Sequence, residues 1–190
     1  MHYIFRILAV CYLSLAGVSA VNALDGHKGP TPAAIKAILD SQEGIWLGTE
    51  MLKNRETGVW RIGNPINLTI TRVGELSDHH RYGEDFAFTR HYRAPLWVFT
   101  VKNEEGKEVS LGEEPITEFS APDMLGHWRY VTKYTSSPLE GPVVDKMEIA
   151  EFSYGTYHKR YFSKPVGSKA PYELYGEFMG RKMEAKTGLR

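Results

Sequence analysis

Arg90 and Tyr92 are residues whose types and spacing suit the binding of an acidic group. Both fall in the segment "EDFAFTRHY", where a two-residue period places Phe86, Phe88, Arg90 and Tyr92 on one face of a β-strand. A guanidinium presents a fixed fork of donors and a phenol adds a hydroxyl, so the pair could hold a carboxylate at the end of an apolar pocket. The alternative is an outward face on which Arg90 pairs with a neighbouring acid.

A second aromatic face lies in the segment "HWRYVTKY". The same period puts Trp128, Tyr130 and Tyr134 on one side of this strand. If these rings and those of Phe86 and Phe88 face inward, they line a cavity that binds a small apolar molecule, since ligand pockets are mostly lined by such side chains.

Histidines supply the candidates for metal, haem or acid–base chemistry. His158, in "YGTYHKRYF", is a candidate haem or metal ligand, and His158 or His91 could act as a general base in an enzyme. A hydrogen-bonded strand histidine is the ordinary alternative, and we expect the neighbouring cations Lys159 and Arg160 to lie on a solvated outer face. The sequence contains no G-x-S-x-G, H-E-x-x-H, phosphate-loop or dinucleotide motif. Catalytic residues are therefore not assigned.

The segment "SDHHRYGED" gathers side chains of the types that bind metals. It contains Asp78, His79, His80, Glu84 and Asp85. Adjacent residues on a strand point in opposite directions, and the polar, glycine-flanked composition is typical of a loop. The sequence therefore predicts a solvated loop here.

The elements that must position these residues are mostly strands. "TPAAIKAILDSQ" predicts one short helix, with Thr31 as cap, Pro32 at the first helical position and an apolar face at Ile35, Ile38 and Leu39. From Ile45 onward the hydrophobic period is two. Roughly nine or ten short strands separated by turn signals such as "NEEGK" and "SKPVGSKAP" predict an all-β fold, either an antiparallel sandwich or a closed up-and-down barrel.

The stretch "EGIWLGTE" favours the barrel. In a strand, Gly44, Trp46 and Gly48 point the same way, so a large ring is flanked on its own face by two positions without side chains. Such a strand can bend sharply and let another element cross close by. We expect Trp46 to close one end of the barrel; the alternative is an ordinary core tryptophan of a sandwich.

A short helix followed by Gly44-x-Trp46 on the first strand and a meander of strands resembles the calycin superfamily of lipocalin and fatty-acid-binding-protein-like barrels. The longer Gly44-x-Trp46-x-Gly48 form and "YGEDFAFTRHYRAPLWVFT" are similar to nitrobindin-like haem-binding barrels. The first resemblance implies an antiparallel barrel that holds a small ligand. The second implies haem as a cofactor, with His158 the histidine nearest to the C-terminal strand.

The N-terminal residues predict secretion. One arginine, the apolar run "ILAVCYLSLAGV" and small residues before Ala20 and Ala23 are typical of a cleaved signal peptide over residues 1–23. We expect a flexible leader over 24–30, one barrel domain over 31–190, and no transmembrane anchor in the mature chain. The single cysteine, Cys11, leaves with the signal, so the secreted or periplasmic protein has no disulfide.

The charge balance argues against nucleic acid as a partner, since the chain has 23 Lys and Arg against 23 Asp and Glu. Three hypotheses remain: a barrel that binds a small hydrophobic ligand with or without an acidic group; an enzyme that uses the same cavity; and an interaction protein with a filled core. The identity of the ligand, the oligomeric state, the bacterial or eukaryotic origin and the use of the Asn67 glycosylation sequon stay open.

Overall fold

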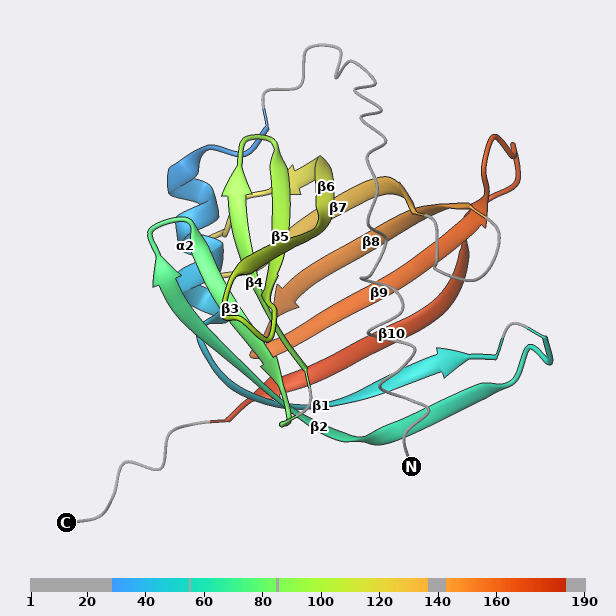
Figure 1. The fold of residues 1–190 in the computed structure, drawn as a ribbon, viewed down its shortest axis with the longest axis horizontal. Helices are drawn as coiled ribbons and strands as arrows, with labels where there is room; N and C mark the ends of the chain where they lie inside the picture. The colour runs from blue at the N-terminus through green and yellow to red at the C-terminus, as the bar shows by residue number, and fades with distance from the viewer. Residues whose placement is uncertain (1–28, 55, 85, 137–142, 184–190) are drawn as a thin grey trace.

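The computed structural model describes residues 29–54, 56–84, 86–136 and 143–183, which form a closed antiparallel barrel (Figure 1). Each strand pairs with the next along the chain, and β1 closes the ring by pairing with β10. This confirms the predicted up-and-down barrel with one short helix before it. The strands are β1 (Gly44–Lys53), β2 (Trp60–Gly74), β3 (Ser77–Tyr82), β4 (Phe86–Arg93), β5 (Leu96–Lys102), β6 (Glu108–Ser120), β7 (Trp128–Ser136), β8 (Val144–Ser153), β9 (Thr156–Pro165) and β10 (Glu173–Lys182).

The helix α2 (Pro32–Gln42) begins where the sequence predicted. The hydroxyl of Thr31 accepts a hydrogen bond from the backbone N–H of Ala34, which satisfies one of the free donors of the first turn. Ile35, Ile38 and Leu39 are completely buried against the barrel core. Within the described residues, no helix has the length and apolar character needed to cross a membrane.

The helix α2 lies against one end of the barrel, which we call the helix end (Figure 1). Indole N–H groups fix it there: Trp46 Nε1 donates to the carbonyl of Gln42, and Trp128 Nε1 donates to Ser41 Oγ, each at 2.8 Å. The strands β1, β3, β5, β7 and β9 run away from the helix and finish at the opposite end, which we call the distal end.

The glycines around Trp46 permit close contacts inside the barrel. A side chain at Gly48 would lie 2.4 Å from the ring of Phe178 and 2.8 Å from the carbonyl of Met179, so only glycine fits. Gly44 has φ of 137°, in the region that favours glycine, and there a side chain would meet Lys182. Trp46 itself is fully buried at the helix end, with its ring edge-on to Phe152 and Tyr157.

Two strands differ from the sequence-based expectation. The segment expected to be a loop around Asp78 and His80 is strand β3, with both side chains buried. Strand β6 was not expected, because Gly112 and Pro115 interrupt its pattern; a register shift in the pairing of β5 with β6 accommodates Gly112 at φ of 145°. The segments "YELYGEF" and "GRKMEAKT", which the alternation predicts as separate strands, both contribute residues to the single strand β10, from Glu173 to Lys182.

Candidate functional site

The aromatic residues proposed to line a cavity all face the barrel interior, but at two different levels. Phe88, Trp128 and Tyr130 are 2–4 % exposed, and the rings of Trp128 and Tyr130 stack with their centroids 5.8 Å apart. So little accessible surface means that these three rings contact neighbouring side chains rather than an open space. Phe86 and Tyr134 lie nearer the distal end and are only half-buried.

Arg90 points into the barrel and is paired there with an acid, so the structure combines the two alternatives that the sequence left open. Its Nη2 and Nε atoms donate to the two carboxylate oxygens of Asp78 at 2.7 and 3.1 Å. Nη2 also donates to Gln42 Oε1 at 2.7 Å, and Nη1 donates to the hydroxyl of Tyr130 at 2.8 Å. All three guanidinium nitrogens thus donate to protein groups, and the side chain joins the helix to the barrel wall.

Tyr92, the other half of the predicted carboxylate anchor, is also engaged. Its hydroxyl donates to the carbonyl of Pro30, just before helix α2. Its ring packs edge-on against Trp97. Arg90 and Tyr92 thus both hold the N-terminal helix region against the barrel.

Asp78 is ionised and His80 is neutral in this network. Burial alone would raise the pKa of Asp78, but the charge of Arg90 and hydrogen bonds hold it well below its usual range. Burial lowers the pKa of His80, although Asp78 opposes this. His80 Nε2 lies 3.1 Å from Asp78 Oδ2 without the alignment of a hydrogen bond, so we take the Arg90–Asp78 pair as the dominant contact.

A second group of ionisable side chains faces the interior between the packed rings and the distal end. We call it the polar cluster; it consists of Glu50 on β1, Glu114 on β6, Lys146 and Glu148 on β8, and Lys159 on β9. Each of these residues is at most 8 % exposed. Such a collection of buried charges is uncommon in a core that serves packing alone.

The contacts within the polar cluster join strands β6 to β9. Lys159 Nζ lies 2.6 Å from Glu148 Oε2, and the hydroxyl of Tyr134 donates to Glu148 Oε1 at 2.8 Å. Thr132 Oγ1 lies 3.1 Å from Glu114 Oε2, to which it donates. Glu148 thus joins Lys159 on β9 to Tyr134 on β7.

Two carboxyl groups of the polar cluster have pKa values near neutral pH. Burial raises the pKa of Glu50 to about 7, with Lys159 opposing the rise. Burial, and then the negative charge of Glu148, raise the pKa of Glu114 to about 8. Glu50 Oε2 has no hydrogen-bond partner among the described residues. Both groups can therefore carry a proton at neutral pH and donate a hydrogen bond.

The raised pKa of Glu50 predicts a pH-dependent stability that Glu50→Gln removes. The unfolded carboxyl ionises near its ordinary value of 4.5 and the folded one near 7, so the wild type loses stability as pH rises between these values. Because one pKa unit corresponds to about 1.4 kcal/mol, the loss relative to the glutamine variant is on the order of 3 kcal/mol by pH 8. Urea unfolding of both proteins from pH 4 to pH 8 measures it. If the free energies of unfolding of the two proteins changed in parallel with pH, Glu50 would be hydrated in the folded state, contrary to this prediction.

The candidate histidines lie on the outer face of the barrel. His158 Nε2 is 3.0 Å from Glu177 Oε2, and His91 Nδ1 is 2.9 Å from Ser77 Oγ. Neither ring can contact a molecule inside the barrel. Among the described residues, no group of three or more His, Cys, Asp or Glu side chains is arranged to hold a metal ion.

The polar cluster is the part of the site that the sequence analysis missed. Lys159 was expected on the outer face, but it points inward with Tyr157 and Tyr161, the two aromatic residues of its own face. Those neighbours were the available signal. It was weak, because the opposite face of β9 carries His158 beside an equally charged and aromatic mixture.

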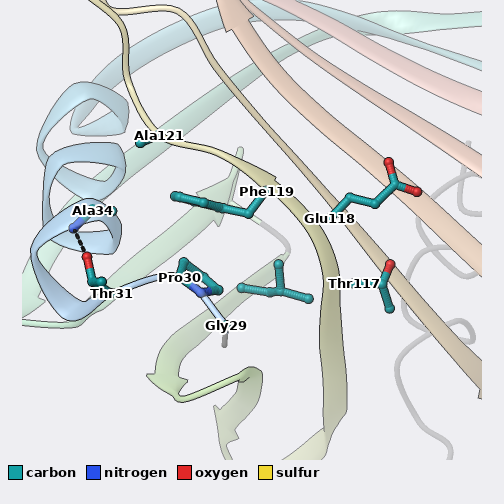
Figure 2. A pocket seen from close by; sticks show the side chains of 9 residues that line it. Gly29, Pro30, Thr31, Ala34, Thr117, Glu118, Phe119 and Ala121 are labelled. Carbon is teal, nitrogen blue, oxygen red and sulfur yellow. Dashed lines mark hydrogen bonds between the residues drawn. The ribbon is translucent and has the colours of Figure 1, made fainter. Parts of the chain in front are cut away.

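A shallow pocket of about 480 Å³ lies outside the barrel, beside the start of the helix (Figure 2). Residues Gly29 to Thr31 and Ala34 form one side, and the end of β6 with Ala121 forms the other. Its walls are largely apolar, and Glu118 points away from it (Figure 2). It shares no residue with the polar cluster.

Comparison of this chain with protein families and with curated proteins gives no match. No model of a known protein family matches it, and no curated protein matches it in sequence. The fold and the side chains themselves therefore carry the functional argument.

Proposed function

We propose that this protein binds a small, largely apolar molecule inside the distal half of its barrel. The observation that carries the proposal is the polar cluster, which lies inside the barrel between the packed rings and the distal end. In this arrangement the packed rings and the half-buried rings of Phe86 and Tyr134 contact the apolar body of the ligand. The polar cluster contacts the polar group of the ligand.

The energetic cost of the polar cluster supports a functional role. Removing an ion from water costs several kcal/mol, and replacing a buried ion pair by apolar residues is often neutral or stabilising. Carboxyl groups with strongly shifted pKa values, such as Glu50 and Glu114, gather at functional sites more often than elsewhere. A filled core that only maintained the fold would not need them.

Access to the polar cluster is best from the distal end. The helix end is covered by α2 and by fully buried rings, whereas Leu52, Tyr134 and Tyr161 face the interior near the distal end and remain half-buried. Gly176 lies opposite Leu52 and adds no side chain of its own. These positions form the proposed mouth of the site.

We further propose that the protein is a calycin-like binding protein of a secreted or periplasmic compartment. The closed antiparallel barrel with its preceding helix supports the first part. The predicted signal peptide, residues 1–23, lies outside the described residues, and the compartment stays a prediction from the sequence. Haem is not part of the proposal, because His158 lies on the outer face.

Titration with 11-(dansylamino)undecanoic acid, a fluorescent fatty-acid probe, tests the site. We expect saturable binding that Leu52→Trp weakens by at least about tenfold, because an indole at this position fills the proposed mouth. Leu47→Trp is the matched control: Leu47 lies on the same strand but is 45 % exposed on the outer face. Equal affinities in both variants, or no binding to the wild type, would remove the proposal.

A further inference from the structure

In the part of the chain that the structure describes, three cations point into the barrel from its strands, and they differ in how they are neutralised. Arg90 is bound by both oxygens of Asp78, and the ammonium of Lys159 lies 2.6 Å from Glu148. Lys146 takes part in none of the ion pairs that the described residues form. It is nevertheless only 4 % exposed.

Lys146 lies on the distal side of the polar cluster, where an entering molecule would meet it first. On strand β8 it precedes Glu148 by two residues toward the distal end, and it is paired with Tyr134 on β7 and Ser163 on β9. Its ammonium lies 6.0 Å from the centre of the Tyr134 ring, a weak contact for a buried charge. Burial and the charge of Glu148 raise the pKa of Glu114, and the charges of Lys159 and Lys146 oppose this rise.

The charge balance of the interior leaves Lys146 without a counter-charge. Asp78 balances Arg90, and Glu148 balances Lys159. The two other inward carboxyl groups have their ionisation suppressed by burial, so at neutral pH Glu114 is mostly protonated and Glu50 partly so. An ammonium that is buried and uncompensated is costly, and a bound anion relieves that cost.

We infer that Lys146 is the anchor for a carboxylate on the bound molecule. This inference rests on the proposed interior binding site and names the chemical class of its ligand: an apolar or aromatic acid whose carboxylate pairs with Lys146 near the distal end. The apolar body then extends past Tyr134 and Phe86 into the barrel. The acid-binding role that the sequence suggested for Arg90 and Tyr92 belongs instead to a lysine on another strand.

Comparing an acid with its ester tests this assignment. The wild type binds 11-(dansylamino)undecanoic acid at least about tenfold more tightly than its methyl ester, which corresponds to about 1.4 kcal/mol. Lys146→Met removes the charge at nearly constant length and abolishes this preference, while the affinity for the ester stays within about threefold. Lys146→Arg, which keeps the charge, retains the preference for the acid.

Lys133→Met is the matched control, because Lys133 lies on β7 with its side chain 41 % exposed and paired with Glu118 on the outer face. We expect Lys133→Met to leave the affinities for the acid and for the methyl ester unchanged. Equal affinities of the wild type for acid and ester would overturn the role of Lys146 while leaving interior binding intact. Failure of both probes to bind the wild type would instead remove the proposed function itself. A Lys146→Met protein that prefers the acid as strongly as the wild type would also overturn the inference.

Discussion

Replacing Asp78 with asparagine destabilises the folded protein by about 3–5 kcal/mol, the usual cost of removing one partner from a buried ion pair. Asp78 is fully buried and accepts two hydrogen bonds from Arg90. Asparagine keeps the volume but leaves the guanidinium charge in the barrel without a counter-charge. Urea unfolding at neutral pH measures the loss.

The stability difference between the wild type and Asp78→Asn depends on pH, and the lowered pKa of Asp78 fixes the direction of this dependence. The unfolded carboxyl ionises near its ordinary value of 3.8, so the stabilisation by Asp78 is fully present above that pH and is lost as pH falls below it. The stabilities of the wild type and Asp78→Asn therefore converge in acid.

Two further variants separate the pair from other causes of instability. Asp78→Leu combined with Arg90→Met recovers part of the loss, because apolar side chains can replace a buried pair, although Gln42 and Tyr130 lose a hydrogen bond. Glu118→Gln removes a carboxylate that pairs with Arg129 and Lys133 at the surface, and it costs less than about 1 kcal/mol. A similarly small cost for Asp78→Asn would mean that water reaches Arg90.

Truncating Trp46 to alanine costs about 3–5 kcal/mol, as expected for a buried aromatic side chain. Its ring is completely buried between α2, Phe152 and Tyr157, and its N–H donates to the carbonyl of Gln42. The variant thus loses core contacts and one of the bonds that fix the helix to the barrel. Denaturant unfolding, monitored by circular dichroism, measures the change in the free energy of unfolding.

Trp60→Ala provides the control for Trp46→Ala, because Trp60 lies at the start of β2 and is 41 % exposed. We expect it to cost less than about 1 kcal/mol, as for surface positions. Equal costs for the two variants would contradict the role of Trp46 as the residue that joins the helix to the barrel.

The two buried charged groups lie in different parts of the barrel interior. The Arg90–Asp78 pair lies with the helix and the packed rings, and all three guanidinium nitrogens of Arg90 donate to protein groups. The polar cluster lies farther from the helix and includes Lys146, whose ammonium forms no ion pair with any other described residue. We therefore expect that stability and the proposed ligand binding can be varied separately, with Lys146→Met altering recognition and Asp78→Asn altering folding.

The sequence by itself determined the class of fold and several side-chain directions. Alternation with a period of two, interrupted by glycine and proline turns, is a local property of strands, and the cap at Thr31 with Pro32 after it is a local property of a helix start. The face shared by Trp128 and Tyr130 was also predictable, because large rings there alternate with charged residues that favour water.

Only the tertiary structure decided which mixed faces are buried and which side chains meet. On β9 both faces carry rings and charges, so alternation could not show that Lys159 points inward and His158 outward. Strand β3 was mistaken for a loop because its polar residues are buried only by pairing with Arg90 on β4. Lys146 lies far from Glu114 and Glu50 in the sequence, and closure of the barrel turns all three toward one interior. An isolated strand does not favour this arrangement. The charges cost free energy only once the barrel removes them from water, and only then do they indicate a candidate functional site.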